Sequence, residues 1–160
     1  MERIDAIMSH KLFQTCQERI YQEEKQRIYC KHGLEHSLDV ARIAYILNLE
    51  EDGGLDRELI YAMALLHDLG RSEEYETGIS HHEAGGELAE KILSECGFTE
   101  EETGLISQAI RTHKKAEPGT GDYCSSLLYR ADKLSRNCFS CEADQTCYWE
   151  MESRNHKISY

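Results

Sequence analysis

The chain has 160 residues, 40% of them hydrophobic and 30% charged, which is the length and balance of a single globular domain with its own core. Its formal net charge of −12 at pH 7 argues against nucleic acid as a partner, because phosphate backbones are bound by basic surfaces. No apolar run approaches the length that crosses a bilayer and residues 1–5 do not resemble a signal peptide, so we expect a cytoplasmic protein with no membrane partner.

Apolar residues recur at the three- and four-residue spacing of helices through most of the chain, and no alternating pattern predicts a strand. The spacing predicts a first long helix over residues 3–27 and a second over residues 34–47, followed by a loop over residues 50–55. The third helix is expected to begin at Asp56, a suitable N-cap, and to end at Gly70.

Two capping boxes predict where the next helices begin. In a capping box, a Ser or Thr and a Glu three residues later satisfy each other's backbone amides. Ser80 and Glu83 form the first box and open a helix that is expected to end at Gly97. Thr99 and Glu102 form the second box and open the following helix.

The last part of the chain combines one more helix with a tail rich in cysteine. After a loop around Pro118, the periodicity predicts a helix over residues 123–136, and the tail occupies residues 137–160. Together these elements predict an all-α bundle of about six helices with a short cysteine-rich C-terminal tail, in a single domain over residues 1–160.

Histidines and aspartates occupy positions on these helices that the periodicity assigns to the core. Each of them alone is more often a satisfied core residue than a ligand. Burying an unpaired imidazole or carboxylate costs on the order of several kcal/mol, however, so a set of them on five helices indicates one shared partner. A divalent metal would satisfy all of them, and Mn, Fe, Co, Ni or Zn suits such ligands. The set comprises His36, His67, Asp68, His81, His113 and Asp132.

Four of these residues, in their order and spacing, resemble the H…HD…D signature of the HD-domain superfamily. His36 stands in HSLDVA, His67 and Asp68 form the doublet of ALLHDLGR, and Asp132 stands in YRADK. The resemblance covers about residues 30–136, the expected domain core. It implies an all-helical phosphohydrolase that cleaves a phosphate ester of a nucleotide or small metabolite with water activated by metal.

The resemblance also implies how one or two divalent metals would be held. The first metal would be bound by His36, His67, Asp68 and Asp132. In two-metal members of the superfamily the aspartate of the doublet bridges the ions, so Asp68 would be shared and His81 and His113 would bind the second. His81 is preferred to His82 because Gly85 completes the H-x-x-x-G pattern of the family, although either of the adjacent histidines remains open.

Four cations follow predicted ligands within three residues and are candidates for neutralising substrate phosphate. Each of them is by default a solvated surface residue: Arg71, Lys114, Lys115 and Lys133. Arg71 is the strongest candidate, because its planar guanidinium matches phosphate and its HDxGR context resembles family members. We assign catalysis to Asp68, Arg71 and Lys133, and substrate binding to Arg71, His82 and Lys114. His32 is expected at the surface, with a substrate or ligand-supporting role as the alternative.

Three closely spaced cysteines, Cys138, Cys141 and Cys147, directly follow the last predicted helix. The chain has seven cysteines, and an odd number disfavours a disulfide framework. The C-x2-C-x5-C spacing predicts a metal clip that needs a fourth ligand. Cys30 is the candidate, because it precedes the helix of His36, which the core metal would bring near Asp132. Zn or an iron–sulfur cluster suits thiolates, and reduced thiols without metal are the alternative.

The four cysteines are also found in similar proteins. The chain resembles a subset of small bacterial HD-domain proteins with a cysteine at each of the four positions. The other three cysteines, Cys16, Cys96 and Cys124, look like ordinary core or surface residues.

Two other functions are compatible with the same histidine and aspartate ligands. One is a diiron oxygenase of the HD type, and the other is a non-enzymatic sensor of a nucleotide or metal.

Overall fold

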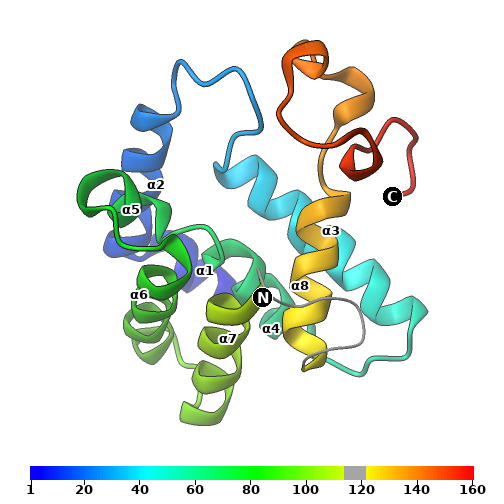
Figure 1. The fold of residues 1–160 in the computed structure, drawn as a ribbon. Coiled ribbons are helices and arrows are strands. Elements are labelled where there is room, and N and C mark those ends of the chain that lie inside the picture. The colour runs from blue at the N-terminus through cyan, green and yellow to red at the C-terminus, as the bar shows by residue number, and fades with distance from the viewer. Residues whose placement is uncertain (114–121) are drawn as a thin grey trace.

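Helices build the whole fold in the computed structural model, which describes residues 1–113 and 122–160 (Figure 1). Within these residues there is no strand, so the predicted all-α class is confirmed. Pro118 lies outside the described residues. The α-helices are, in chain order, α1 Glu2–Ser9, α2 Lys11–Glu23, α3 Leu34–Glu50, α4 Arg57–Leu66, α5 Arg71–Thr77, α6 His81–Glu95, α7 Glu100–Thr112 and α8 Tyr123–Leu134.

The N-terminal segment forms two helices, so the prediction of one helix over residues 3–27 was wrong. The chain turns between α1 and α2 at His10, whose backbone is extended with ψ of 128°. The His10 imidazole accepts a hydrogen bond from the Leu12 backbone N–H at 3.2 Å and thereby caps α2. Periodicity does not reveal the break, because both helices bury residues such as Ile7 and Phe13 in the same core.

The predicted helix from Asp56 to Gly70 is also divided. The Asp56 side chain caps α4 as expected, but α4 ends at Leu66 and a turn carries residues 67–70. Gly70 does not stop a helix: its φ of −64° and ψ of −12° are helical, and α5 begins directly after it. A Cβ at Gly70 would meet His81 O at 2.1 Å, so glycine is required there because α6 approaches the turn closely.

The two predicted capping boxes have different outcomes. Thr99 and Glu102 form the expected reciprocal bonds at the start of α7. Ser80 makes no side-chain bond at the start of α6, so the first box was wrong. The carboxylate of Glu74, from the unpredicted helix α5, instead accepts the His81 N–H at 3.3 Å.

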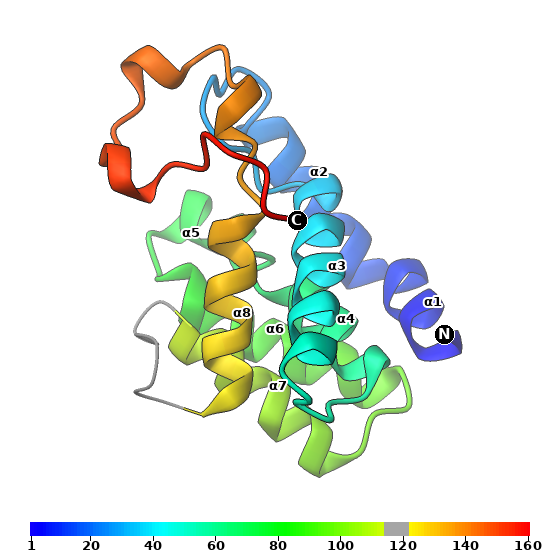
Figure 2. The ribbon, with the colours of Figure 1, turned by 90° about the vertical axis from the view of Figure 1, so that its right-hand side faces the viewer.

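The core lies where α3, α4, α6, α7 and α8 pack against one another. In Figures 1 and 2, α3 and α8 lie side by side, and the tail lies beyond one end of this pair, next to the segment that joins α2 to α3. The tail contains only short 3-10 helices, which are η2 Cys138–Ser140, η3 Asp144–Thr146 and η4 Met151–Ser153. Among the described residues, no helix is both long and apolar enough to cross a membrane.

Candidate metal centre

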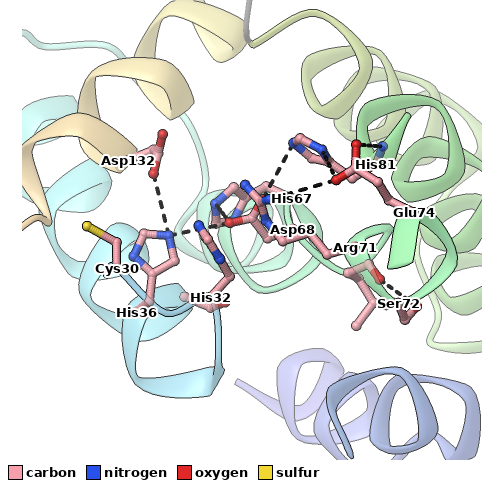
Figure 3. A network of polar contacts seen from close by, with 12 residues as sticks. Cys30, His32, His36, His67, Asp68, Arg71, Ser72, Glu74, His81 and Asp132 are labelled. Carbon is pink, nitrogen blue, oxygen red and sulfur yellow. Dashed lines mark hydrogen bonds and ion pairs between the residues drawn. The ribbon is translucent and has the colours of Figure 1, made fainter. Parts of the chain in front are cut away.

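The six predicted ligands come from separate elements that converge at the centre of the bundle. His36 lies on α3, His67 and Asp68 in the turn after α4, and Asp132 on α8 (Figure 3). His36, His67 and Asp132 form a group of three donor side chains whose ligand atoms all lie within 4.8 Å of one another. The two other predicted ligands are His81 at the start of α6 and His113 at the end of α7.

Asp68 lies among the histidines and faces them with both carboxylate oxygens. Its Oδ2 lies 3.1 Å from His67 Nε2 and 3.6 Å from His36 Nε2, while its Oδ1 lies 3.8 Å from His81 Nε2. Asp132 Oδ1 lies 3.4 Å from His36 Nε2. The Asp68 carboxylate therefore stands between the two predicted ligand sets, which is the placement that a shared ligand needs.

The protein fixes each of these imidazoles through its Nδ1 atom. His67 Nδ1 donates to Ala64 O, and His113 Nδ1 donates to Ile110 O, both at 2.7 Å. Both acceptors are carbonyls of a last helical turn, which helix ends leave without a helical partner. With Nδ1 protonated in this way, each imidazole keeps the unprotonated Nε2 that a metal requires.

His36 and His81 are fixed in the same manner by residues from other elements. The Ser135 hydroxyl donates to Asp132 O at 2.8 Å, so its oxygen is left to accept from His36 Nδ1 at 3.3 Å. His81 Nδ1 lies 2.9 Å from Glu74 Oε2. Metal-binding histidines in proteins commonly have such a carboxylate, hydroxyl or carbonyl behind them.

Two buried nitrogens show that the site fits a metal ion. His36 Nε2 and His67 Nε2 are buried and have no hydrogen-bond partner among the described residues. An unpaired buried imidazole nitrogen is costly, and both atoms face carboxylate oxygens within 4 Å. A divalent cation between these nitrogens and carboxylates would satisfy all of them together.

The cationic groups around the two carboxylates favour their ionised form. Burial would raise the pKa of Asp68, but His67, His36 and Arg71 hold it well below its usual range. Burial also opposes ionisation of Asp132, and His36 outweighs it and lowers the pKa of that carboxyl. Burial would lower the pKa of His36, whereas the Asp132 and Asp68 carboxylates raise it to about 9. Both carboxylates are therefore ionised at neutral pH.

The surroundings of His81 and His113 favour the neutral form of their imidazoles. Burial lowers the pKa of His113 to about 3, and His67 and His82 add to the shift. Burial and the nearby Arg71 lower the pKa of His81. Neutral imidazole is the form that binds metals. The His82 ring packs 4.6 Å from the His113 ring and 3.9 Å from the His81 ring, so the preference for His81 as ligand stays a prediction.

Two of the predicted cations are paired with the aspartates of the site rather than free at the surface. Arg71 Nε donates to Asp68 Oδ1 at 2.8 Å, and only 20% of the Arg71 side chain is exposed. Lys133 Nζ donates to Asp132 Oδ2 at 2.7 Å and lies 5.2 Å from the centre of the Trp149 ring. Lys114 and Lys115 lie outside the described residues.

A buried network next to the ligands was missed at the level of sequence. Glu24 is 3% exposed, and its carboxylate contacts His32 Nδ1 and accepts from the Tyr75 hydroxyl, both at 2.6 Å. Burial opposes ionisation of Glu24, but His32 and Tyr75 lower its pKa to about 2. The expected surface position of His32 was wrong, because its side chain is only 12% exposed and its ring packs 5.8 Å from that of His36. No local signal indicates this pairing.

The structure also places the seven cysteines, all of which are free thiols. Cys16, Cys96 and Cys124 are buried in the core, one of the two expected placements. Cys30 and the three tail cysteines line a common cavity beside the core site. These four positions are Cys30, Cys138, Cys141 and Cys147.

Comparison with known proteins relates both the sequence and the fold to one family. The HD domain family matches residues 33–149. An uncharacterized protein of Clostridium beijerinckii is 41% identical over 160 residues, which is 100% of both chains. A solved structure described as a predicted HD superfamily hydrolase, from an uncultured Thermotogales bacterium, has a TM-score of 0.66 at 24% identity and covers 90% of this chain and 79% of its own.

Ribonucleases are similar to this chain over part of its length. Ribonuclease Y of Aquifex aeolicus is 38% identical over 90 residues, which is 56% of this chain and 14% of that protein. Ribonuclease Y of Enterococcus faecalis is 35% identical over 107 residues, 67% of this chain and 18% of that protein. The chain therefore spans less than a fifth of the length of these two ribonucleases.

Proposed function

The chain belongs to the HD-domain family, as the sequence resemblance predicted, and from this we propose that it is a metal-dependent phosphohydrolase acting on a phosphate ester of a nucleotide or other small metabolite. The observation that carries the proposal is the pair of unpartnered nitrogens, His36 Nε2 and His67 Nε2, which face the Asp68 and Asp132 carboxylates. This donor set suits a divalent transition metal such as Mn, Fe, Co, Ni or Zn.

The residues divide into a first and a second ligand set in the proposed site. His36, His67, Asp68 and Asp132 would hold the first ion, while His81 and His113 would hold the second with Asp68 shared. When bound, such ions would polarise the phosphoryl oxygens and make a water molecule acidic enough to react near neutral pH. Asp68 and Asp132 would keep the ions in place because both carboxyls are ionised.

Arg71 is the proposed phosphate-binding residue. Its Nε is fixed on Asp68 Oδ1 at 2.8 Å, so the guanidinium plane is oriented before substrate arrives. The Nη1 and Nη2 nitrogens would donate to two oxygens of the phosphoryl group, the bidentate geometry for which arginine is suited. Lys133 would orient Asp132 through their 2.7 Å bond and balance the negative charge that develops on the substrate.

Charge favours a small phosphoester over a nucleic acid as the substrate. The formal net charge of −12 would repel a polyanion over most of the surface, whereas a single phosphate group needs positive charge only at the site. RNA is a substrate of the ribonuclease Y relatives by their name, and their similarity covers only a small part of those proteins. We therefore place small phosphoesters first in the panel to be tested.

The test is phosphate release by the metal-loaded protein across a panel of nucleotides and small phosphoesters. Wild-type protein should release phosphate, and Asp68→Ala should lose the core metal and at least about 10²-fold in rate while staying helical by circular dichroism. The matched control is Asp5→Ala, which removes an exposed carboxylate on α1 and should be fully active. Full activity in Asp68→Ala would refute the site, and oxygen uptake by the iron form without phosphate release would favour the oxygenase alternative.

A further inference from the structure

Four thiols from opposite ends of the chain line one cavity of about 330 Å³. Cys30 comes from the segment between α2 and α3, and Cys138, Cys141 and Cys147 come from the tail. Figure 2 shows these two segments next to each other. The Tyr29 hydroxyl donates to Thr146 O at 3.1 Å, and the Tyr29 and Tyr148 rings lie 5.3 Å apart, so this arrangement is built from direct contacts.

The tail lacks the apolar burial that holds the rest of the chain together. None of its 3-10 helices contains a buried residue, and Phe139, Tyr148 and Met151 are 46%, 62% and 57% exposed. A segment without its own core is commonly ordered by a metal or by disulfides. The tail cysteines form no disulfide, so a metal bound by their thiolates is the other way to order this segment.

Charged residues of both signs line the cavity, and the acidic ones are Glu35, Asp39 and Asp144. Arg136 is 8% exposed and stacks 3.8 Å from the Trp149 ring centre, and Arg154 donates to Cys147 O at 2.9 Å. Both arginines line the cavity together with Lys31.

The separation of the sulfurs distinguishes a cluster from a single ion. Zn–S bonds of about 2.3 Å in a tetrahedron place the sulfurs within about 4 Å of one another. Among the described residues, these cysteines do not form a group of three or more whose ligand atoms all lie within 4.8 Å of one another, so the sulfurs are more widely spaced than around one zinc ion. A larger inorganic core occupying the cavity fits that spacing.

We propose that Cys30, Cys138, Cys141 and Cys147 bind an iron–sulfur cluster of the [4Fe–4S] type, which fastens the tail to the segment before α3. This site has ligands of its own but adjoins the core centre, because His36 lines the same cavity, and the proposal does not depend on the hydrolase activity. It connects the start of α3, which carries His36, with the end of α8, which carries Asp132. The cluster thereby fixes the two helices whose relative position sets the first ligand group, and Figure 3 shows Cys30 beside His36.

The experiment is purification of the full chain without oxygen, followed by iron and acid-labile sulfide analysis and Mössbauer spectroscopy. We expect about four sulfides per chain and the spectrum of a [4Fe–4S] cluster. Sulfide is decisive because the core histidines and aspartates bind metal without it. A wild-type protein without sulfide, whether it holds zinc at the cysteines or no metal, would overturn the proposal, and this measurement needs no variant.

Variants then assign the ligands. A Cys138→Ser, Cys141→Ser protein should lose at least nine-tenths of the sulfide, whereas Cys96→Ala, which removes a core cysteine, should retain it. Asp68→Ala should keep the sulfide while it loses the core metal. Sulfide content therefore tests the cluster, and core metal content with phosphate release tests the hydrolase proposal separately. Sulfide that persists in the double variant, or that disappears in Asp68→Ala, would contradict the assignment.

Discussion

Gly70 is the position where one methyl group should disturb both the fold and the core site. It lies in the turn that carries His67 and Asp68, and its φ of −64° and ψ of −12° suit alanine as well as glycine. Backbone strain therefore plays no part in a Gly70→Ala change. The added Cβ would lie 2.1 Å from His81 O and 2.4 Å from Gly85 N, two backbone atoms of α6 that no side-chain rotation can move away.

The size of the effect follows from these distances. Carbon–oxygen contacts settle at about 3.3 Å, so the first turn of α6 must withdraw by roughly 1 Å. Overpacking of this kind lowers the free energy of unfolding by about 3 kcal/mol. Alanine also reduces the conformational entropy of the unfolded chain, which raises that free energy by about 0.5–1 kcal/mol. The net loss of stability is therefore about 2 kcal/mol. His81 would move away from Asp68, and a misplacement of about 1 Å lowers catalytic rates by about 10²-fold.

Urea unfolding of the metal-free protein and phosphate release by the loaded protein measure the two effects. Gly104→Ala is the matched control, because Gly104 lies inside α7 with no atom within 4 Å of the added Cβ. That change should stabilise the protein by roughly 0.5–1 kcal/mol and leave the activity intact. A Gly70→Ala protein as stable as Gly104→Ala, with unchanged metal affinity, would refute the close approach of α6 to the turn.

Three further predictions concern the charges and caps around the site. Burial would lower the pKa of His36, but Asp132 and Asp68 raise it to about 9, so in the metal-free protein its stabilising contribution is complete below pH of about 6.5 and is lost as the pH rises through 9. Urea titrations should show this decline in wild type and not in His36→Gln. Arg71→Lys should reduce kcat/KM for phosphoesters by at least about 10-fold with the metal content unchanged; a wild-type value would remove Arg71 from substrate binding. Thr99→Ala should lower the free energy of unfolding by about 1 kcal/mol and leave activity unchanged, and equal stability would contradict the capping box.

The sequence predicts most elements that bury a broad apolar face, because such a face repeats at helical spacing. It accordingly predicts the start of α3 at Leu34 and the capped start of α7 at Thr99. Helix α5 escapes prediction, because its sequence RSEEYET is short and mostly polar and buries only Ser72. The break at His10 escapes for a different reason, since two successive helices on the same core keep the periodicity of one.

The candidate ligands were easier to predict than the residues that hold them. An inward-facing histidine or aspartate stands out against an apolar helix face in the sequence itself. Glu24 and Glu74 give no such signal, because acidic residues are abundant on the surface of a chain with 30 of them. Only the fold brings Glu24 within 2.6 Å of His32 and Glu74 within 2.9 Å of His81.

The four predicted histidine ligands fall into two pairs, because two are held by their own helix and two by residues of other elements. His67 and His113 are each fixed by a carbonyl three residues earlier in the chain, so their orientation is set once α4 and α7 form. His36 depends on Ser135 at the end of α8, and His81 depends on Glu74 of α5. Each ion of a two-metal site would thus combine an imidazole fixed within its own helix with one oriented by a residue of another helix or helix end. Disturbing the tail should therefore affect the first ion. Disturbing α5 should affect the second ion and also Asp68, because its partner Arg71 is the first residue of α5.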